Sequence, residues 1–122
     1  LYHMEDAYII KGGQSLSGTV ELSGAKNIAL KVLIAALLFE GKVVLQNIPR
    51  IDDIQELIHL LTLLGAEVSF EENTVTIDPS QVKENKVDLL HASKIRVSFL
   101  LFAPLLYRFQ KAEIPNPGGC RL

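Results

Sequence analysis

The stretch from Ile28 to Phe39 is apolar at nearly every position, and it constrains the fold more than any other part of the sequence. A helix with so little polar surface cannot lie open to water, so we expect it to be buried. Its longest unbroken apolar run begins at Val32 and is far shorter than the roughly 18 residues that a membrane span requires. We therefore predict a helix enclosed by other elements of a soluble domain. Gly41 is expected to close it in the left-handed conformation.

Short alternating or β-branched segments predict strands on both sides of this helix. Two of them precede it, Tyr8–Ile10 and Gly18–Leu22, and a third, Val43–Leu45, follows it. Between the second strand and the helix lies Ser23–Asn27, a loop of small residues. The chain therefore begins as strand, strand, helix, strand.

A second helix is indicated by a regular apolar stripe, which will pack on the core. Asp52 or Asp53 can cap its start, with Gln55 or Glu56 as the reciprocal partner in a capping box. Gly65 is expected to end it. The stripe consists of Ile54, Leu57, Ile58, Leu61 and Leu64.

After the second helix, residues 68–72 and 74–78 predict a hairpin that turns through Asn73, a residue tolerant of tight turns. The order is then strand, helix, strand, helix, strand, strand. This order predicts a fold of the α/β (α+β) class, in which the helices cover one face of a sheet.

The pattern starts again after a polar connection. Ser93 can cap a third helix that runs from Lys94 to about Phe109, and Pro104 is expected to kink or break it. A strand is predicted at Lys111–Ile114. A second helical unit is therefore begun and left unfinished, which predicts an incomplete domain whose partner strands lie downstream.

Composition excludes several classes of function. The 12 Lys and Arg against 14 Asp and Glu give a net charge of -2, so no basic field drives binding to nucleic acid. No membrane segment or leader is apparent, which favours a cytoplasmic protein, and Leu1–His3 are expected to be a remnant ahead of the native start at Met4. Cys120 stands alone and no Cys/His cluster has metal spacing, so we expect no metal and no cofactor.

The loop Ser23–Asn27 is the first candidate site. It feeds a strand into a helix through small residues, where free N–H groups favour an anion and Lys26 adds a positive charge. A phosphate or carboxylate would fit. The alternative is a solvated loop in which Asn27 acts as a simple helix cap.

Two further places combine a helix start or a loop with a reactive or cationic side chain. Arg96, just inside the third helix, can offer a planar donor fork to an anion, or it can be an exposed partner of a nearby carboxylate. Cys120 follows two glycines on a loop, where Arg121 could lower its pKa and make it a nucleophile or general acid. The alternative for Cys120 is an inert, packed thiol.

Taken in order, the motifs of these places are those of a known family. They are Gly24–Asn27, Ala92–Arg96, Pro104–Leu106 with Arg108–Phe109, and Pro117–Cys120. From Met4 onward the chain resembles the N-terminal part of the UDP-N-acetylglucosamine 1-carboxyvinyltransferases, also called UDP-N-acetylglucosamine enolpyruvyl transferases. The related shikimate-pathway enolpyruvyl transferases carry a Gly-Asp-Lys-Ser type of loop at the first motif and lack the Pro-Gly-Gly-Cys loop.

This resemblance implies an activity and an architecture. The family transfers the enolpyruvyl group from phosphoenolpyruvate to the 3'-hydroxyl of UDP-N-acetylglucosamine with release of phosphate, the first committed step of peptidoglycan synthesis. Its members have two domains of repeated βαβαββ units, an inside-out α/β barrel, with the active site in the cleft. By the same resemblance, residues 4–21 belong in part with the C-terminal domain, and residues 22–122 form part of the N-terminal domain. Tyr8–Ile10 are therefore expected to lack their native sheet here and either to pair elsewhere or to fray.

The resemblance also implies residue roles. Lys26 and Asn27 match the pair that meets phosphoenolpyruvate, and Asn27 and Arg96 match residues that bind the nucleotide sugar. Cys120 matches the loop cysteine that protonates phosphoenolpyruvate, forms a covalent adduct with it and is alkylated by fosfomycin.

Departures from the family pattern limit what the chain is expected to do alone. Asn116 replaces an apolar residue, and the Gly-x-Arg-Pro segment, the catalytic base and further ligand contacts of the family lie beyond Leu122. We therefore expect the fragment to be inactive and to self-associate through surfaces meant for missing repeats. The alternatives are a transferase of the shikimate 3-phosphate type and a non-catalytic module of the same fold.

Overall fold

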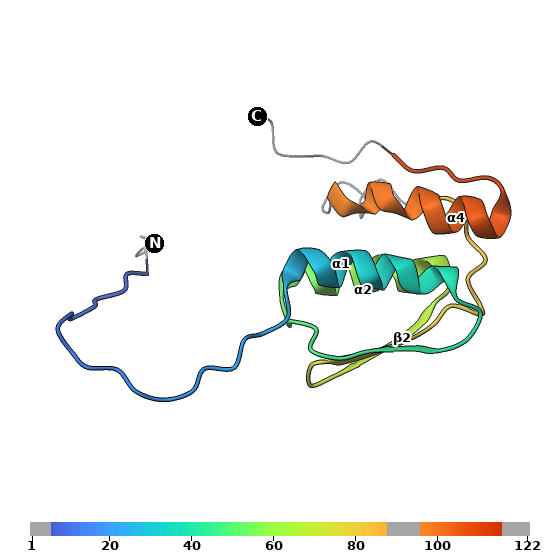
Figure 1. The fold of residues 1–122 in the computed structure, drawn as a ribbon. Helices are drawn as coiled ribbons and strands as arrows, with labels where there is room; N and C mark the ends of the chain where they lie inside the picture. The colour runs from blue at the N-terminus through green and yellow to red at the C-terminus, as the bar shows by residue number, and fades with distance from the viewer. Residues whose placement is uncertain (1–5, 88–95, 116–122) are drawn as a thin grey trace.

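The computed structural model of the chain describes residues 6–87 and 96–115. Within these ranges, a three-stranded sheet is covered on one face by a layer of helices, and a further helix lies on the outside of that layer (Figure 1). The predicted α+β fold, with helices on one face of the sheet, is therefore confirmed.

The sheet has the strand order β1-β3-β2, formed by β1 (Val43–Leu45), β2 (Glu67–Glu71) and β3 (Thr74–Asp78). The central strand β3 runs antiparallel to both neighbours, so β1 and β2 run parallel to each other. Ile77 pairs with Val43 on one side and with Val68 on the other. The predicted hairpin is confirmed, although the left-handed residue in its turn is Glu72 (φ 51°) and not Asn73.

The first helix, α1 (Lys26–Ala35), continues as a 3-10 turn, η1 (Ala36–Leu38). Its burial is confirmed, because α1 packs on α2 on one side and on η2 of the outer helical segment on another. The predicted cap at Gly41 is wrong. The chain leaves the helix at Phe39, which is extended (φ -92°, ψ 154°), and Gly41 is not among the glycines with positive φ.

The second helix, α2 (Asp52–Leu64), confirms the predicted apolar stripe, to which the structure adds Leu60. Gly65 ends it in the left-handed conformation, with φ 111°. The N–H of Gly65 donates to the Thr62 carbonyl and that of Ala66 to the Leu61 carbonyl, which is a Schellman motif. The predicted capping box is wrong: Ile51 holds the N-cap position without a side-chain bond, and both aspartates lie inside the first turn.

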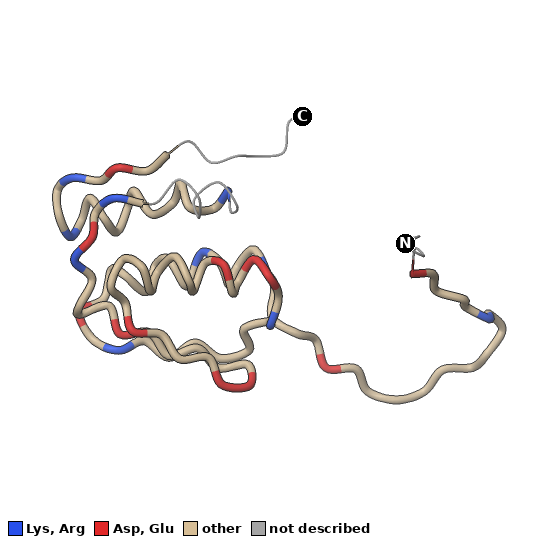
Figure 2. Tube along the Cα trace, turned by 180° about the vertical axis from the view of Figure 1, so that it is seen from behind, with Lys and Arg blue, Asp and Glu red and all other residues tan. Residues whose placement is uncertain are grey.

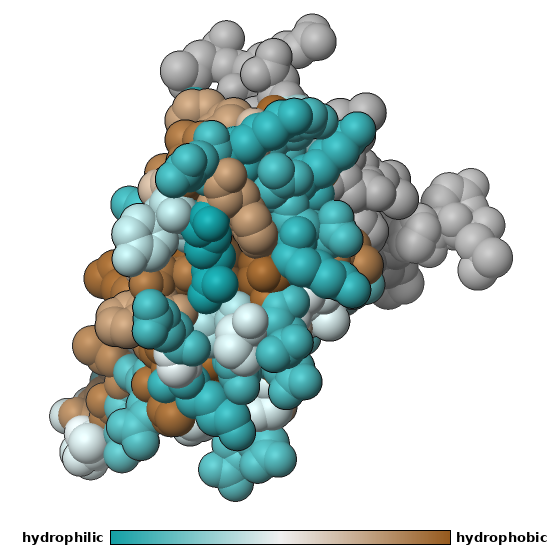
Figure 3. Space-filling view, turned by 90° about the vertical axis from the view of Figure 1, so that its right-hand side faces the viewer, coloured by the Kyte–Doolittle hydropathy of each residue, from teal (hydrophilic) through white to brown (hydrophobic). Residues whose placement is uncertain are grey.

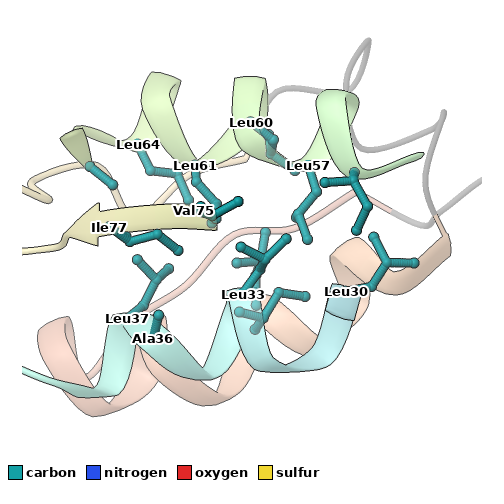
Figure 4. Packing of buried hydrophobic residues seen from close by; sticks show 14 of the residues in the cluster. Leu30, Leu33, Ala36, Leu37, Leu57, Leu60, Leu61, Leu64, Val75 and Ile77 are labelled. Carbon is teal, nitrogen blue, oxygen red and sulfur yellow. The ribbon is translucent and has the colours of Figure 1, made fainter. Parts of the chain in front are cut away.

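The core lies between the sheet and the helices (Figure 4). Leu33 of α1 and Leu37 of η1 face Val75 and Ile77 of β3, while Leu57 and its neighbours close the space from α2. Alternation along β3 buries Val75 and Ile77 and turns the threonines outward. The sheet therefore presents one apolar face to the helices.

The third helical segment begins as a 3-10 turn, η2 (Arg96–Leu101), and continues as α4 (Phe102–Phe109). Pro104 lies in the first turn of α4, where a missing N–H costs no hydrogen bond, so the helix breaks before the proline. Leu101 and Leu105 are buried. Phe99, Leu100, Leu106 and Tyr107 remain between 41% and 71% exposed, so the outer face of this segment is apolar.

Arg108 joins this segment to the first helix. Its guanidinium donates from Nε to the Leu37 carbonyl at 2.7 Å and from a terminal nitrogen to the Phe39 carbonyl at 2.9 Å. Leu37 lies in η1 and Phe39 directly follows it, so both carbonyls are at the point where the helix no longer supplies partners.

Figure 3 views the end of the molecule where α1 and α4 finish, and its hydrophobic side chains gather along one side.

Several predicted strands are corrected. The structure forms no strand at Gly18–Leu22, and Tyr8–Ile10 is unpaired, which is the frayed outcome expected without its native sheet; residues 6–22 are an exposed arm that leaves the body (Figure 1). The predicted strand at Lys111–Ile114 is reduced to an isolated parallel bridge between Lys86 and Glu113. A strand requires a paired neighbour, and none faces these segments within the described ranges.

Candidate functional site at the helix starts

The helix starts gather at one end of the molecule. Figure 1 shows α1 and the η2–α4 segment beginning at the same end, and Figure 4 shows α1 and α2 running in the same direction. The ion pair between Lys26 and Asp53 joins the starts of α1 and α2, and α1 also contacts η2. Since a helix start carries free N–H groups and partial positive charge, this end of the molecule is suited to an anion.

Lys26 is the first residue of α1, and its Nζ lies 3.1 Å from Oδ2 of Asp53, in the first turn of α2. The two side chains are 51% and 44% exposed, so a ligand can reach both. Asn27 follows, also exposed, and the reading of Asn27 as a helix cap is wrong, because Ala25 holds the N-cap position without a side-chain bond. The first N–H groups of α1 are therefore left uncapped by any side chain at that position.

Gly24 fixes the entry into α1. Its N–H donates to Oδ1 of Asn47 at 3.1 Å, and a Cβ at this position would collide with the Asn47 carbonyl oxygen. Asn47 itself is left-handed, with φ 56°. The small residue at this position is thus required by the close approach of the Asn47 backbone.

Arg96 is the first residue of η2 and is exposed. The structure brings η2 against α1, so the elements that carry Lys26 and Arg96 are neighbours. Ser93, the predicted cap, and Cys120, the predicted general acid, lie outside the described residues.

Two residues of this end were missed by sequence reasoning. Asn47 was given no role from the sequence, although an Asn before Ile48-Pro49 is a position where a left-handed turn can be expected. Asp53 was read only as a possible helix cap, and nothing local in the sequence signals its ion pair with Lys26.

Charges on the described body are interspersed rather than gathered into a face of one sign (Figure 2). No three His, Cys, Asp or Glu side chains in residues 6–87 and 96–115 are arranged to hold a metal ion. Over the same ranges, no helix has the length and apolarity needed to cross a membrane. A cavity of about 400 Å³ lies beside the Lys86–Glu113 bridge, and of the candidate residues that the structure describes, Lys26, Asn27 and Arg96, none lines it.

These observations define an α+β unit in which α1 begins with a lysine and η2 begins with an arginine. The sequence model of the family described as EPSP synthase (3-phosphoshikimate 1-carboxyvinyltransferase) matches residues 10–122, and the chain belongs to this family.

Relatives within the family agree with the resemblance drawn from the motifs. The UDP-N-acetylglucosamine 1-carboxyvinyltransferase of Desulfosudis oleivorans is 41% identical over 117 residues, which are 96% of this chain and 28% of that protein. UDP-N-acetylglucosamine 1-carboxyvinyltransferase 2 of Clostridium acetobutylicum is 44% identical over 94% of this chain and 28% of that protein. The chain thus spans little more than a quarter of the length of these relatives.

A solved structure shares the fold. The enolpyruvyl transferase NikO from Streptomyces tendae superposes with a TM-score of 0.70 and 27% identity, covering 80% of this chain and 23% of that one. The expected fold class, a partial domain of the enolpyruvyl transferase type, is confirmed.

Proposed function

We propose that the chain forms the N-terminal part of an enzyme that transfers the enolpyruvyl group of phosphoenolpyruvate to the 3'-hydroxyl of UDP-N-acetylglucosamine, with release of phosphate. The observation that carries this proposal is the identity of about 40% over nearly the whole chain with transferases named for that sugar. These names favour the cell-wall reaction over the shikimate 3-phosphate type. The product would enter peptidoglycan synthesis in the cytoplasm.

The end of the molecule at which α1 and η2 begin supplies groups suited to the anionic substrate. Phosphoenolpyruvate carries a phosphate and a carboxylate, and Lys26 lies beside uncapped N–H groups at the start of α1. Asn27, the next residue, is exposed and carries an amide that can donate and accept hydrogen bonds. Arg96, on the neighbouring η2, offers a planar donor fork to the nucleotide sugar. Cations and helix N–H groups directed at phosphate stabilise the negative charge that develops as it departs.

The reaction also needs a proton delivered to carbon. In the proposed mechanism the Cys120 thiol protonates the methylene carbon of phosphoenolpyruvate while the sugar 3'-oxygen bonds to the adjacent carbon and loses its proton to a base. Loss of a proton from the new methyl group then expels phosphate and restores the double bond. A thiol in this role is also open to a covalent adduct with phosphoenolpyruvate and to alkylation by fosfomycin.

The decisive test uses the full-length protein that contains this segment. Phosphate release from phosphoenolpyruvate is measured with UDP-N-acetylglucosamine, with shikimate 3-phosphate and with neither, in the intact protein and in Cys120→Ser. We expect release only with the nucleotide sugar, falling at least about 100-fold in Cys120→Ser, since general acid catalysis contributes about 10²–10⁴-fold. We also expect no release by the 122-residue chain alone.

The outcomes separate the alternatives. Release with shikimate 3-phosphate instead would move the protein to the shikimate branch of the family. No release with either acceptor would favour a non-catalytic module, and full activity of Cys120→Ser would remove the thiol from the mechanism.

A further inference from the structure

An ion pair joins the starts of the first two helices. Nζ of Lys26, at the first position of α1, lies 3.1 Å from Oδ2 of Asp53, at the second position of α2. A lysine at this place is electrostatically unfavourable, because the helix start is itself positive. The aspartate lies at the favourable end of its own helix and offsets the charge of the lysine.

The backbone on both sides of this pair is held in place. Asn47 accepts the Gly24 N–H two residues before Lys26, so the loop that precedes α2 also holds the entry to α1. The next residue, Ile48, exchanges two bonds with Asn73 in the hairpin: its N–H donates to the Asn73 carbonyl at 2.8 Å, and its carbonyl accepts from Nδ2 at 3.0 Å. The two helix starts therefore have a fixed separation, across which the lysine and the aspartate meet.

This geometry constrains a side chain that is otherwise flexible. Lys26 has four methylenes and three ammonium protons, so an unpaired lysine would sample many directions. One bond to Asp53 selects a direction and leaves two protons for oxygen acceptors. The Lys26 side chain is 51% exposed, so its ammonium is then available to an anion at the start of α1.

We propose that Asp53 is a positioning residue, which holds the Lys26 ammonium toward the anionic part of phosphoenolpyruvate. The proposal rests on the function proposed above. Asp52, the preceding residue in the same turn, is exposed and forms no ion pair with any residue in the ranges 6–87 and 96–115. Asp52 is therefore a matched control that removes the same charge one residue away.

The test compares Asp53→Asn, Asp53→Glu and Asp52→Asn in the full-length protein by steady-state phosphate release. For Asp53→Asn we expect kcat to fall roughly 10- to 100-fold, as for other losses of alignment. The KM for phosphoenolpyruvate should not rise, because removing a negative charge beside the ammonium favours anion binding. The KM for the nucleotide sugar should stay unchanged, Asp53→Glu should regain part of the rate, and Asp52→Asn should stay within about twofold of the parent.

A second comparison separates positioning from structural support. In a Lys26→Gln background, Asp53→Asn should cause no further loss, because the group it positions is gone. The proposal is overturned if Asp53→Asn behaves like Asp52→Asn, or if its full effect on kcat persists in the Lys26→Gln background. An inactive parent protein would instead refute the proposed function itself, and this inference with it.

Discussion

The first helical unit, residues 26–78, and the second segment, residues 96–115, contain similar apolar sequences but differ in how much regular secondary structure they form. The first unit has two helices against a paired sheet, and α2 ends in a complete Schellman motif. The second has a 3-10 turn, an eight-residue helix and an isolated bridge. What separates them is the sheet: the first unit carries its own strands, and the second does not.

The difference shows how such units depend on one another. Leu101 and Leu105 are fully buried although their segment has no sheet, because they pack on the helices of the first unit. In return, α1 is covered on its outer side. Helix α1 is therefore stabilised from two sides, by the sheet of its own unit and by the helical segment of the next unit.

The largest expected effect comes from breaking the shared core. Leu33→Ala removes a fully buried side chain of α1 and should lower the free energy of unfolding of the chain by about 2–5 kcal/mol, measured by urea denaturation. Leu63→Ala, on the exposed side of α2 at 47% exposure, is the matched control and should cost about 0.5 kcal/mol or less. Equal losses in the two variants would contradict the view of α1 as the shared element.

A smaller effect is expected from separating the two regions. Arg108→Ala removes two charge-assisted bonds to the Leu37 and Phe39 carbonyls and should cost about 1.5–3 kcal/mol. Amide hydrogen exchange should accelerate first in α4, while β3 stays protected. Lys111→Ala, an exposed cation nearby in sequence, should leave exchange in α4 unchanged. Uniform acceleration across the sheet would show instead that the two regions open as one.

The smallest effect concerns the end of β3. Hydrogen bonds from the Ser80 side chain and, secondarily, from its backbone N–H hold the pKa of Asp78 below its ordinary value of 3.8. A lowered folded-state pKa stabilises the fold above pH 3.8, and this contribution is lost as the pH falls through the folded-state pKa.

Ser80→Ala should therefore raise the pKa of Asp78 toward 3.8, measured by carboxyl NMR titration, and weaken the acid dependence of stability. Ser17→Ala, in the exposed arm, should leave the titration unchanged. An unaltered Asp78 titration in Ser80→Ala would place the cause elsewhere.

Local signals in the sequence predicted the first unit well. The stripe of α2, its end at Gly65 and the hairpin follow from periodicity and turn chemistry within short windows. The predicted strand at Gly18–Leu22 was wrong, and Tyr8–Ile10 is unpaired as expected of a segment without its native sheet, because a strand forms only where a distant segment pairs with it. Gly41 was wrong for a related reason: the η1 carbonyls are satisfied by Arg108, far along the chain, and no left-handed cap is used.

The candidate site was predicted in part. The small residues before a buried helix pointed to Lys26, which the structure places at the start of α1, whereas the close approach of the Asn47 backbone at Gly24 was not predicted. The ion pair with Asp53 could not be predicted, because 27 positions of sequence separate residues that meet only once α1 and α2 pack together. The roles of Asn27, Arg96 and Cys120 stay predictions.

The bonds from Arg108 to Leu37 and Phe39 span 71 and 69 residues of sequence, and this has a consequence for synthesis on the ribosome. When the end of η1 has been translated, the residues that cover the outer side of α1 have yet to be made. At about 5–20 residues per second, roughly 4–14 seconds pass before Arg108 is made. During that interval the nascent chain exposes an apolar helix, so its early folding depends on the hairpin and α2 closing over the other side first.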